Sequence, residues 1–244
     1  MQNYLTQSER ANNMDYNAVA KKYDNYGNEA ITDWAIAYPA LLNEIAPFDN
    51  KMILDYGCGT GKVCRVIRDK GSKVIGVDIS PKILTTTQNY DNSDVEYRCI
   101  KPAKIDFMKN DHVDNAISAF VFCNVQTREH LELNVREIYR VLKPGGKFSI
   151  VNANWEHCNG REFISYKFDS IPSLTPGQRV KLTLKASKNL IVENYFWGEK
   201  DYISVLEKAG FKNISVKRPL GVGNNIDWMG EDTCPLYLVV SAEK

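Results

Sequence analysis

The sequence predicts an α/β fold built on a doubly wound, mostly parallel sheet. Three observations predict it. Short apolar segments alternate with helical patterns five times between residues 51 and 152. The segment 116–122 is nearly all apolar, as expected of a strand covered on both faces. A glycine-rich turn separates the first strand from the helix that follows it. Because ligands of such sheets bind at the carboxyl ends of the strands, a functional site is expected along that edge.

The composition limits the classes of partner and compartment. The 244 residues include 31 basic and 30 acidic side chains, so net charge does not favour a nucleic-acid or membrane-surface partner. The six cysteines form no C-x-x-C pair, which favours reduced thiols in a cytoplasmic protein over disulfides or a metal site. The first residues are polar and no apolar run approaches 18 residues, so neither a signal peptide nor a membrane span is expected.

The elements that precede the sheet are expected to be helices. Apolar residues at helical spacing follow Asp15, and a second amphipathic pattern runs over 33–45. Both lie before the first strand, so residues 1–50 are predicted to form a helical cover over the core.

The core itself is expected to span residues 51–152. Its last helix, 129–142, should end at Lys143-Pro144-Gly145-Gly146, because proline and paired glycines stop a helix. The five strands are expected at 51–56, 73–77, 95–99, 116–122 and 147–152.

Regularity breaks at 153–198, which carries seven aromatic residues and is interrupted by prolines. The segment leaves the functional edge after the fifth strand, so it is predicted to be a lid or substrate wall, with a small satellite core as the alternative. A helix at 201–209 and strands at 213–217 and 236–242 complete the chain as residues 199–244. The whole chain, 1–244, is therefore predicted to be a single domain.

The glycine turn indicates a nucleoside rather than a pyrophosphate. Its third glycine, Gly61, comes one residue too early for G-x-G-x-x-G, and Lys62 is followed by Val63 instead of the Ser or Thr of a phosphate loop. Asp55, just before the glycines, would repel a pyrophosphate but suits a cationic ligand. Asp78, after the second strand, can accept hydrogen bonds from ribose hydroxyls. Taken singly, each acid would more often be structural: Asp55 could cap the turn, and Asp78 could cap the start of a helix.

Three motifs in order resemble the class I S-adenosylmethionine-dependent methyltransferases. They are Asp55-x-Gly57-x-Gly59-x-Gly61, Val77-Asp78-Ile79-Ser80 and Leu142-Lys143-Pro144-Gly145-Gly146. The resemblance is to the small-molecule enzymes related to the ubiquinone/menaquinone methyltransferases, and it covers about residues 15–152. It implies a Rossmann-like sheet of seven strands whose last strand is antiparallel and lies beside the fifth. It also implies S-adenosylmethionine as cofactor, with S-adenosylhomocysteine as product.

The resemblance further implies roles for individual residues. Asp55 would orient the methionine end, Asp78 would take both ribose hydroxyls and Ile79 would pack on the adenine. Cys123 would offer its carbonyl from the end of the fourth strand. One position departs from the family: Lys101 stands where an acid usually holds the adenine amino group. Either backbone near Pro102 and Ala103 replaces that acid, or the correspondence of positions is shifted. The remaining residues implied to bind the cofactor are Gly57, Cys58, Gly59, Tyr16 and Tyr23, the two tyrosines as a cover unless they are simply a core stripe.

The acceptor side is less defined by sequence. His157 is the candidate general base, because of three histidines it alone follows the fifth strand at the functional edge. A small, planar or partly apolar acceptor is expected, methylated on oxygen, nitrogen or carbon mainly through positioning. The protein is expected to be a monomer or homodimer without a nucleic-acid or membrane partner. A nucleotide-binding oxidoreductase and a non-enzymatic regulatory module are the alternatives. The residues predicted to bind the acceptor are Trp155, Phe168, Tyr195 and Trp197.

Overall fold

The computed structural model describes residues 30–90, 94–185, 189–223 and 225–244. Its main sheet has seven strands in the order β3-β2-β1-β4-β5-β10-β9. Neighbouring strands from β3 to β5 are parallel, whereas β10 is antiparallel to both β5 and β9. This confirms the expected doubly wound sheet with its last strand antiparallel beside the fifth. The strands are β1 (Met52–Tyr56), β2 (Lys73–Asp78), β3 (Glu96–Cys99), β4 (Val113–Ala119), β5 (Leu142–Ala153), β9 (Lys212–Lys217) and β10 (Tyr237–Glu243).

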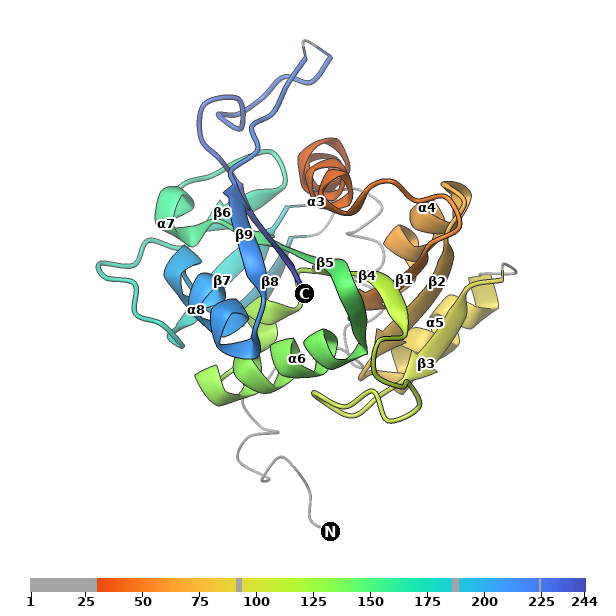
Figure 1. The fold of residues 1–244 in the computed structure, drawn as a ribbon. Coiled ribbons are helices and arrows are strands. Elements are labelled where there is room, and N and C mark those ends of the chain that lie inside the picture. The colour runs from red at the N-terminus through yellow and green to blue at the C-terminus, as the bar shows by residue number, and fades with distance from the viewer. Residues whose placement is uncertain (1–29, 91–93, 186–188, 224) are drawn as a thin grey trace.

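Helices cover both faces of this sheet (Figure 1). On one face, α3 (Tyr38–Ile45) and α4 (Lys62–Asp69) bury apolar residues in one core cluster. On the other face, α6 (Arg128–Val141) and α8 (Glu199–Ala209) pack on a second cluster. A further helix, α5 (Pro81–Tyr90), flanks β2 and β3.

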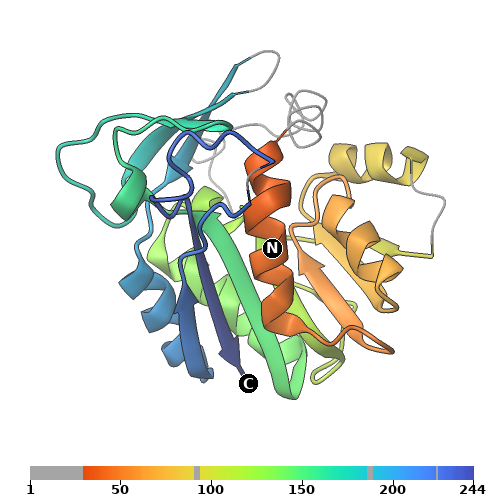
Figure 2. The same cartoon turned by 90° about the horizontal axis from the view of Figure 1, so that it is seen from above.

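The helix expected at 33–45 forms, with an irregular start. Near its start it contains a π-helical segment, η1 (Asp33–Ala37), which continues directly into α3. Figure 2 shows α3 running along the sheet, with its beginning at the edge where the parallel strands end. The helix expected after Asp15, with Tyr16 and Tyr23, lies outside the described residues.

The predicted end of the fourth strand was wrong by three residues. β4 stops at Ala119, and residues up to Phe122 were expected to belong to it. The physical reason is Phe120, whose φ of 58° lies in the left-handed region and cannot continue a strand. Cys123 therefore lies one turn later, in the 3₁₀ helix η2 (Phe122–Asn124), and not at the strand's end.

Residues 153–198 are more regular than the sequence indicated. After the short helix α7 (Trp155–Cys158), they form a separate antiparallel sheet in the order β6-β7-β8. Its aromatic residues are buried in the two core clusters of the domain. The strands are β6 (Tyr166–Phe168), β7 (Arg179–Leu184) and β8 (Leu190–Tyr195).

Two kinds of feature are absent from the described residues. No described helix is both long and apolar enough to cross a membrane. In the same part of the chain, no group of three or more histidine, cysteine or acidic residues is arranged to hold a metal ion.

Candidate active site

The glycine loop after β1 is held tightly against the neighbouring strands. The backbone N–H groups of Gly57 and Cys58 both donate to the carbonyl oxygen of Val77, at 2.8 and 2.9 Å. Gly57 has a φ of 82°, and a Cβ there would lie 2.2 Å from Val121 Cγ2. Gly59 differs, because nothing lies within 4 Å of the position of its Cβ. The loop is thus closed beneath Gly57 and open beside Gly59, where the backbone is accessible to a ligand.

Asp78 fixes the open part of this loop. Its Oδ2 accepts the Gly59 N–H at 3.0 Å, and its Oδ1 accepts the Ser80 N–H at 2.9 Å. The Ile79 N–H also interacts with this carboxylate. Because a carboxylate offers about four acceptor positions, capacity remains for a further donor. The next residue, Ile79, keeps 59% of its surface exposed, which is a large apolar area beside the carboxylate. Burial raises the pKa of Asp78.

Asp55, at the end of β1, is buried beneath the loop. Its Oδ2 accepts a hydrogen bond from the Cys64 thiol at 3.1 Å. Burial raises the pKa of Asp55 to about 7, with the thiol opposing the rise and the negative charge of Asp78 adding to it. A carboxylate that ionises near neutral pH in a desolvated position is a favourable partner for a cationic group.

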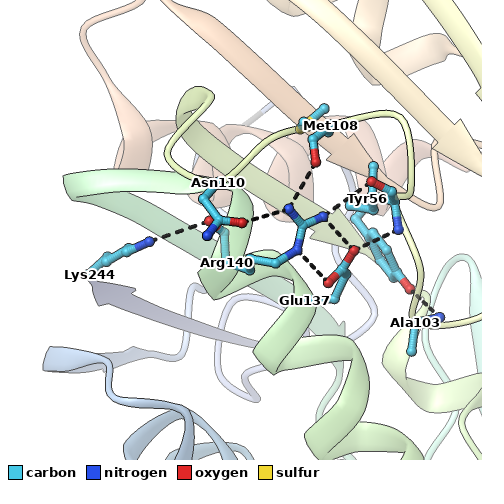
Figure 3. Close-up of polar contacts among 8 residues, drawn as sticks. Tyr56, Ala103, Met108, Asn110, Glu137, Arg140 and Lys244 are labelled. Atoms are coloured by element: carbon cyan, nitrogen blue, oxygen red, sulfur yellow. Dashed lines mark hydrogen bonds and ion pairs between the residues drawn. The ribbon is translucent and has the colours of Figure 1, made fainter.

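The loop after β3 is anchored by groups that sequence reasoning did not single out (Figure 3). The Tyr56 hydroxyl donates to Asn134 Oδ1 on α6 and accepts the Ala103 N–H at 3.3 Å. Ala103 itself has a φ of 54°, in the left-handed region. The next turn is held by Glu137, whose Oε1 accepts the Ile105 N–H at 2.7 Å. These contacts join residues 32 to 78 positions apart, so no local motif indicates them.

Arg140 completes this network. It pairs with Glu137 and donates to the carbonyl oxygens of Met108 and Ile105, at 2.8 and 3.2 Å. The loop predicted to meet the adenine is therefore clamped to α6, and Lys101 lies exposed at its start.

The four aromatic residues predicted to bind the acceptor are not brought together. Trp155 and Phe168 pack edge to face at 4.8 Å in the core cluster on the α3 face of the sheet. Tyr195 and Trp197 belong to the cluster on the other face, where the Trp197 indole donates to the Val125 carbonyl at 2.8 Å. All four are buried.

His157 lies exposed on α7, with its Nδ1 3.2 Å from Asn154 Oδ1. Its predicted role as general base, like the predicted ligand roles of the residues above, stays a prediction.

A buried carboxylate at the same edge escaped the sequence reasoning. Asp33, in η1, is 2% exposed, and its Oδ1 accepts hydrogen bonds from the hydroxyls of Tyr166 and Tyr237, at 2.6 and 2.7 Å. A signal for it exists in the sequence: Asp33 shares the buried face of its helix with Ile36 and Ala37, at the i, i+3, i+4 spacing. An acid on an apolar face requires partners, and these come from β6 and β10.

Comparison with known proteins supports one class of function. Residues 54–150 match the family model described as a methyltransferase domain. The chain is 28% identical over 213 residues to N-demethylindolmycin N-methyltransferase of Streptomyces griseus, covering 83% of this chain and 90% of that protein. It is 28% identical to demethylmenaquinone methyltransferase of Tropheryma whipplei (strain Twist), covering 83% of this chain and 84% of that one.

Solved structures agree on the fold. An S-adenosylmethionine-dependent methyltransferase of Mesorhizobium loti matches with a TM-score of 0.63 at 20% identity, over 87% of this chain and 98% of that one. One of Listeria monocytogenes matches with a TM-score of 0.61 at 24% identity, over 85% and 97%.

The domain match and the relatives indicate methyltransferase activity, and the solved structures show that the chain has the fold of S-adenosylmethionine-dependent methyltransferases. The chain is a methyltransferase, and S-adenosylmethionine is its cofactor. This confirms the predicted activity and cofactor, and the relatives give no support to the oxidoreductase alternative.

Proposed function

We propose that the cofactor binds along the glycine loop and that a small acceptor approaches from the side of η1, β6 and the start of β10. The observation that carries the cofactor site is the pairing of Asp78 with Gly59: the carboxylate holds the loop N–H while the Gly59 α-carbon faces open space. The residues present suit a sulfonium nucleoside, because the loop offers backbone groups, a ribose acceptor and a buried acid instead of a phosphate cradle.

Each residue proposed to bind the cofactor contacts a different portion of it. Asp78 accepts the ribose hydroxyls, the exposed face of Ile79 packs on the adenine, and Asp55 attracts the methionine ammonium. Tyr56 holds Ala103 so that the backbone at Pro102–Ala103 meets the adenine edge, which favours backbone contact over the missing acid at Lys101. The other groups proposed for the cofactor are the backbone of Gly57, Cys58, Gly59 and Cys123.

When bound, S-adenosylmethionine supplies an electrophilic methyl group. The chain's own residues then have to orient the acceptor and exclude water, since methyl transfer from a sulfonium is governed by positioning. The aromatic side chains at this edge serve both purposes: Phe120 packs between Tyr38 and Tyr237, with ring centroids 6.2 and 5.9 Å apart. We propose that the enzyme works in the cytoplasm as a monomer or homodimer, and the balanced charge supports a small-molecule acceptor over a nucleic acid.

The test is a thermal-shift and calorimetric comparison of S-adenosylhomocysteine with NADH, followed by transfer of a labelled methyl group. We expect S-adenosylhomocysteine alone to raise the melting temperature, and label to leave S-adenosylmethionine for a small molecule. A rise in melting temperature with NADH alone would contradict S-adenosylmethionine as the cofactor. Binding of S-adenosylhomocysteine without transfer to any molecule would favour the regulatory module.

A further inference from the structure

Asp33 lies at the beginning of the helix that borders the active-site edge, and its local backbone is unusual. The helix is widened to a π-helix over Asp33–Ala37 before it becomes α3. π-Helical segments are rare and frequently occur at functional sites. Here the residue that begins the widened segment is the buried acid.

Three elements bring other groups to the same carboxylate. Tyr166 from β6 and Tyr237 from β10 donate their hydroxyls to Oδ1. Lys62, the first residue of α4 after the glycine loop, is close enough for its charge to act on Asp33. Figure 2 shows the beginning of the α3 segment between the small sheet and α4. Asp33 is thus placed between the loop proposed for the cofactor and the insertion proposed to cover the acceptor.

Among the described residues, the hydrogen-bond donors that reach the Asp33 carboxylate all meet one of its two oxygens. Both tyrosine hydroxyls use Oδ1, and within the described ranges no hydrogen bond reaches Oδ2. Burial raises the pKa of Asp33 to about 6, although the two tyrosine hydrogen bonds oppose the rise. The positive charge of Lys62 also lowers it. At neutral pH the group is therefore mostly ionised, with one oxygen able to accept from a ligand donor.

We infer that Asp33 is an acceptor-binding residue and that the acceptor presents an amino nitrogen to its Oδ2. This inference rests on the proposed function and names the substrate class of that site. The negative charge of Asp33 favours an amine acceptor over an acceptor that is itself negatively charged. As a nitrogen takes up a methyl group it becomes positively charged, and a nearby carboxylate in a desolvated site stabilises that charge. A phenolate or carbanion acceptor would arrive negatively charged and be repelled by Asp33.

The aromatic residues around Asp33 suit the same acceptor. Trp34 packs on Tyr38 at 4.9 Å, and Tyr166 packs on Tyr237 at 6.1 Å, all edge to face. Faces of such rings attract alkylammonium groups and stack on flat ring systems. An amine carried on an apolar or aromatic skeleton satisfies both the rings and the carboxylate.

The step balances without another reactant. The neutral amine's lone pair forms the N–C bond, the C–S bond breaks, and its electron pair stays on sulfur. The positive charge moves from sulfonium to ammonium, and one N–H proton then passes to Asp33 Oδ2 and on to water.

The experiment uses the whole chain with ¹³C-methyl-labelled S-adenosylmethionine and a small-molecule cell extract, and reads the labelled carbon by NMR. We expect label on nitrogen, because N-, O- and C-methyl carbons differ in chemical shift. Label on oxygen or carbon overturns the inference while leaving the proposed function intact. Label on nothing, or no binding of S-adenosylhomocysteine, counts against the proposed function and against the inference with it.

Variants then test the residue itself with the amine so identified. For Asp33→Asn we expect kcat/KM to fall at least 100-fold while the Kd for S-adenosylhomocysteine stays within threefold. Asp169→Asn changes an exposed acid just after β6; it is the control for the loss of a carboxylate and should behave as the wild type. Unchanged kcat/KM in folded Asp33→Asn overturns the inference.

A pH profile separates this role from a purely structural one and serves if Asp33→Asn does not fold. At saturating S-adenosylmethionine, where the pH dependence of cofactor binding through Asp55 does not contribute, kcat should fall as pH drops through about 6 and Asp33 becomes protonated. Tyr166→Phe removes a hydrogen bond to the ionised form, so the acid limb should move to higher pH. The inference is overturned if that limb does not move in Tyr166→Phe, or if it disappears in His157→Ala, which would assign it to the histidine.

Discussion

The two buried carboxylates of the candidate site, Asp55 and Asp33, have similar environments, but their partners lie at very different distances along the sequence. Burial raises the pKa of both, to about 7 and about 6. Asp55 lies within one short motif with its glycine loop, whereas Asp33 meets partners 133 and 204 residues away. The proposed cofactor side is thus built from neighbours in sequence, and the proposed acceptor side from segments that only the fold brings together. This difference explains why one side can be recognised from the sequence and the other cannot.

The largest expected effect comes from a substitution in the proposed cofactor site. Asp78→Ala removes the proposed ribose acceptor and frees the Gly59 N–H, so affinity for S-adenosylhomocysteine should fall at least about 100-fold, since hydrogen bonds to a charged group are worth about 1.5–3 kcal/mol each. Isothermal titration measures it. Asp69→Ala, an exposed acid on α4, is the control and should bind normally. Near-normal binding by folded Asp78→Ala would refute the proposed ribose contact.

A smaller effect concerns the ionisation of Asp55. Because its pKa is raised to about 7, affinity for the cationic methionine end should weaken as pH falls below 7, by up to roughly tenfold per unit. Titrations between pH 8 and pH 5.5 measure this, and Asp55→Asn should bind weakly with a flat profile. A flat profile for the wild type would show that Asp55 does not meet a charged group.

The same ionisation predicts an effect on stability. A raised folded-state pKa means that the fold disfavours the ionised form, so the penalty is present above pH 7 and is relieved as pH falls toward 4. Ligand-free Asp55→Asn should therefore be more stable than wild type at pH 8, by on the order of 2 to 4 kcal/mol, and gain little at pH 4.5. Urea unfolding at both pH values tests the sign. A loss of stability at pH 8 would contradict it.

The smallest expected effect tests whether the loop after β3 contacts the adenine. Tyr56→Phe leaves the Ala103 N–H and Asn134 without their partner, and should cost about 1–2 kcal/mol of stability and about three- to tenfold in cofactor affinity. Tyr139→Phe, whose ring packs on Phe211 farther along α6, controls for loss of a hydroxyl. Equal cofactor affinity in both variants would show that Ala103 does not contact the adenine.

The fold was largely predictable because its signals are local. Alternating apolar segments define the parallel strands, and Lys143-Pro144 with two glycines marks the end of α6, although these residues already belong to β5. The end of β4 was not predictable from local signals. Phe120 there has a left-handed φ, and its ring packs between Tyr38 and Tyr237, which come from distant segments. The small sheet of the insertion was missed for a similar reason: its strands are short, and prolines and loops separate them.

The residues of the candidate site likewise fall into those that local sequence identifies and those that only the fold identifies. Asp55, Asp78 and the glycines carry their chemistry in their spacing, so sequence alone places them. The aromatic residues of the insertion could be counted but not assigned to a face, and the structure divides Trp155 and Phe168 from Tyr195 and Trp197. Tertiary partners decide which aromatic residue is core and which acid is poised for a ligand.

The most direct test of the division into two sides is the titration of S-adenosylhomocysteine into wild type, Asp78→Ala and Asp33→Asn under one condition, at pH 7.5. The account predicts that Asp78→Ala loses binding and that Asp33→Asn retains the wild-type Kd within threefold while losing methyl transfer. Loss of cofactor binding by a folded Asp33→Asn would place that acid on the cofactor side and contradict the division.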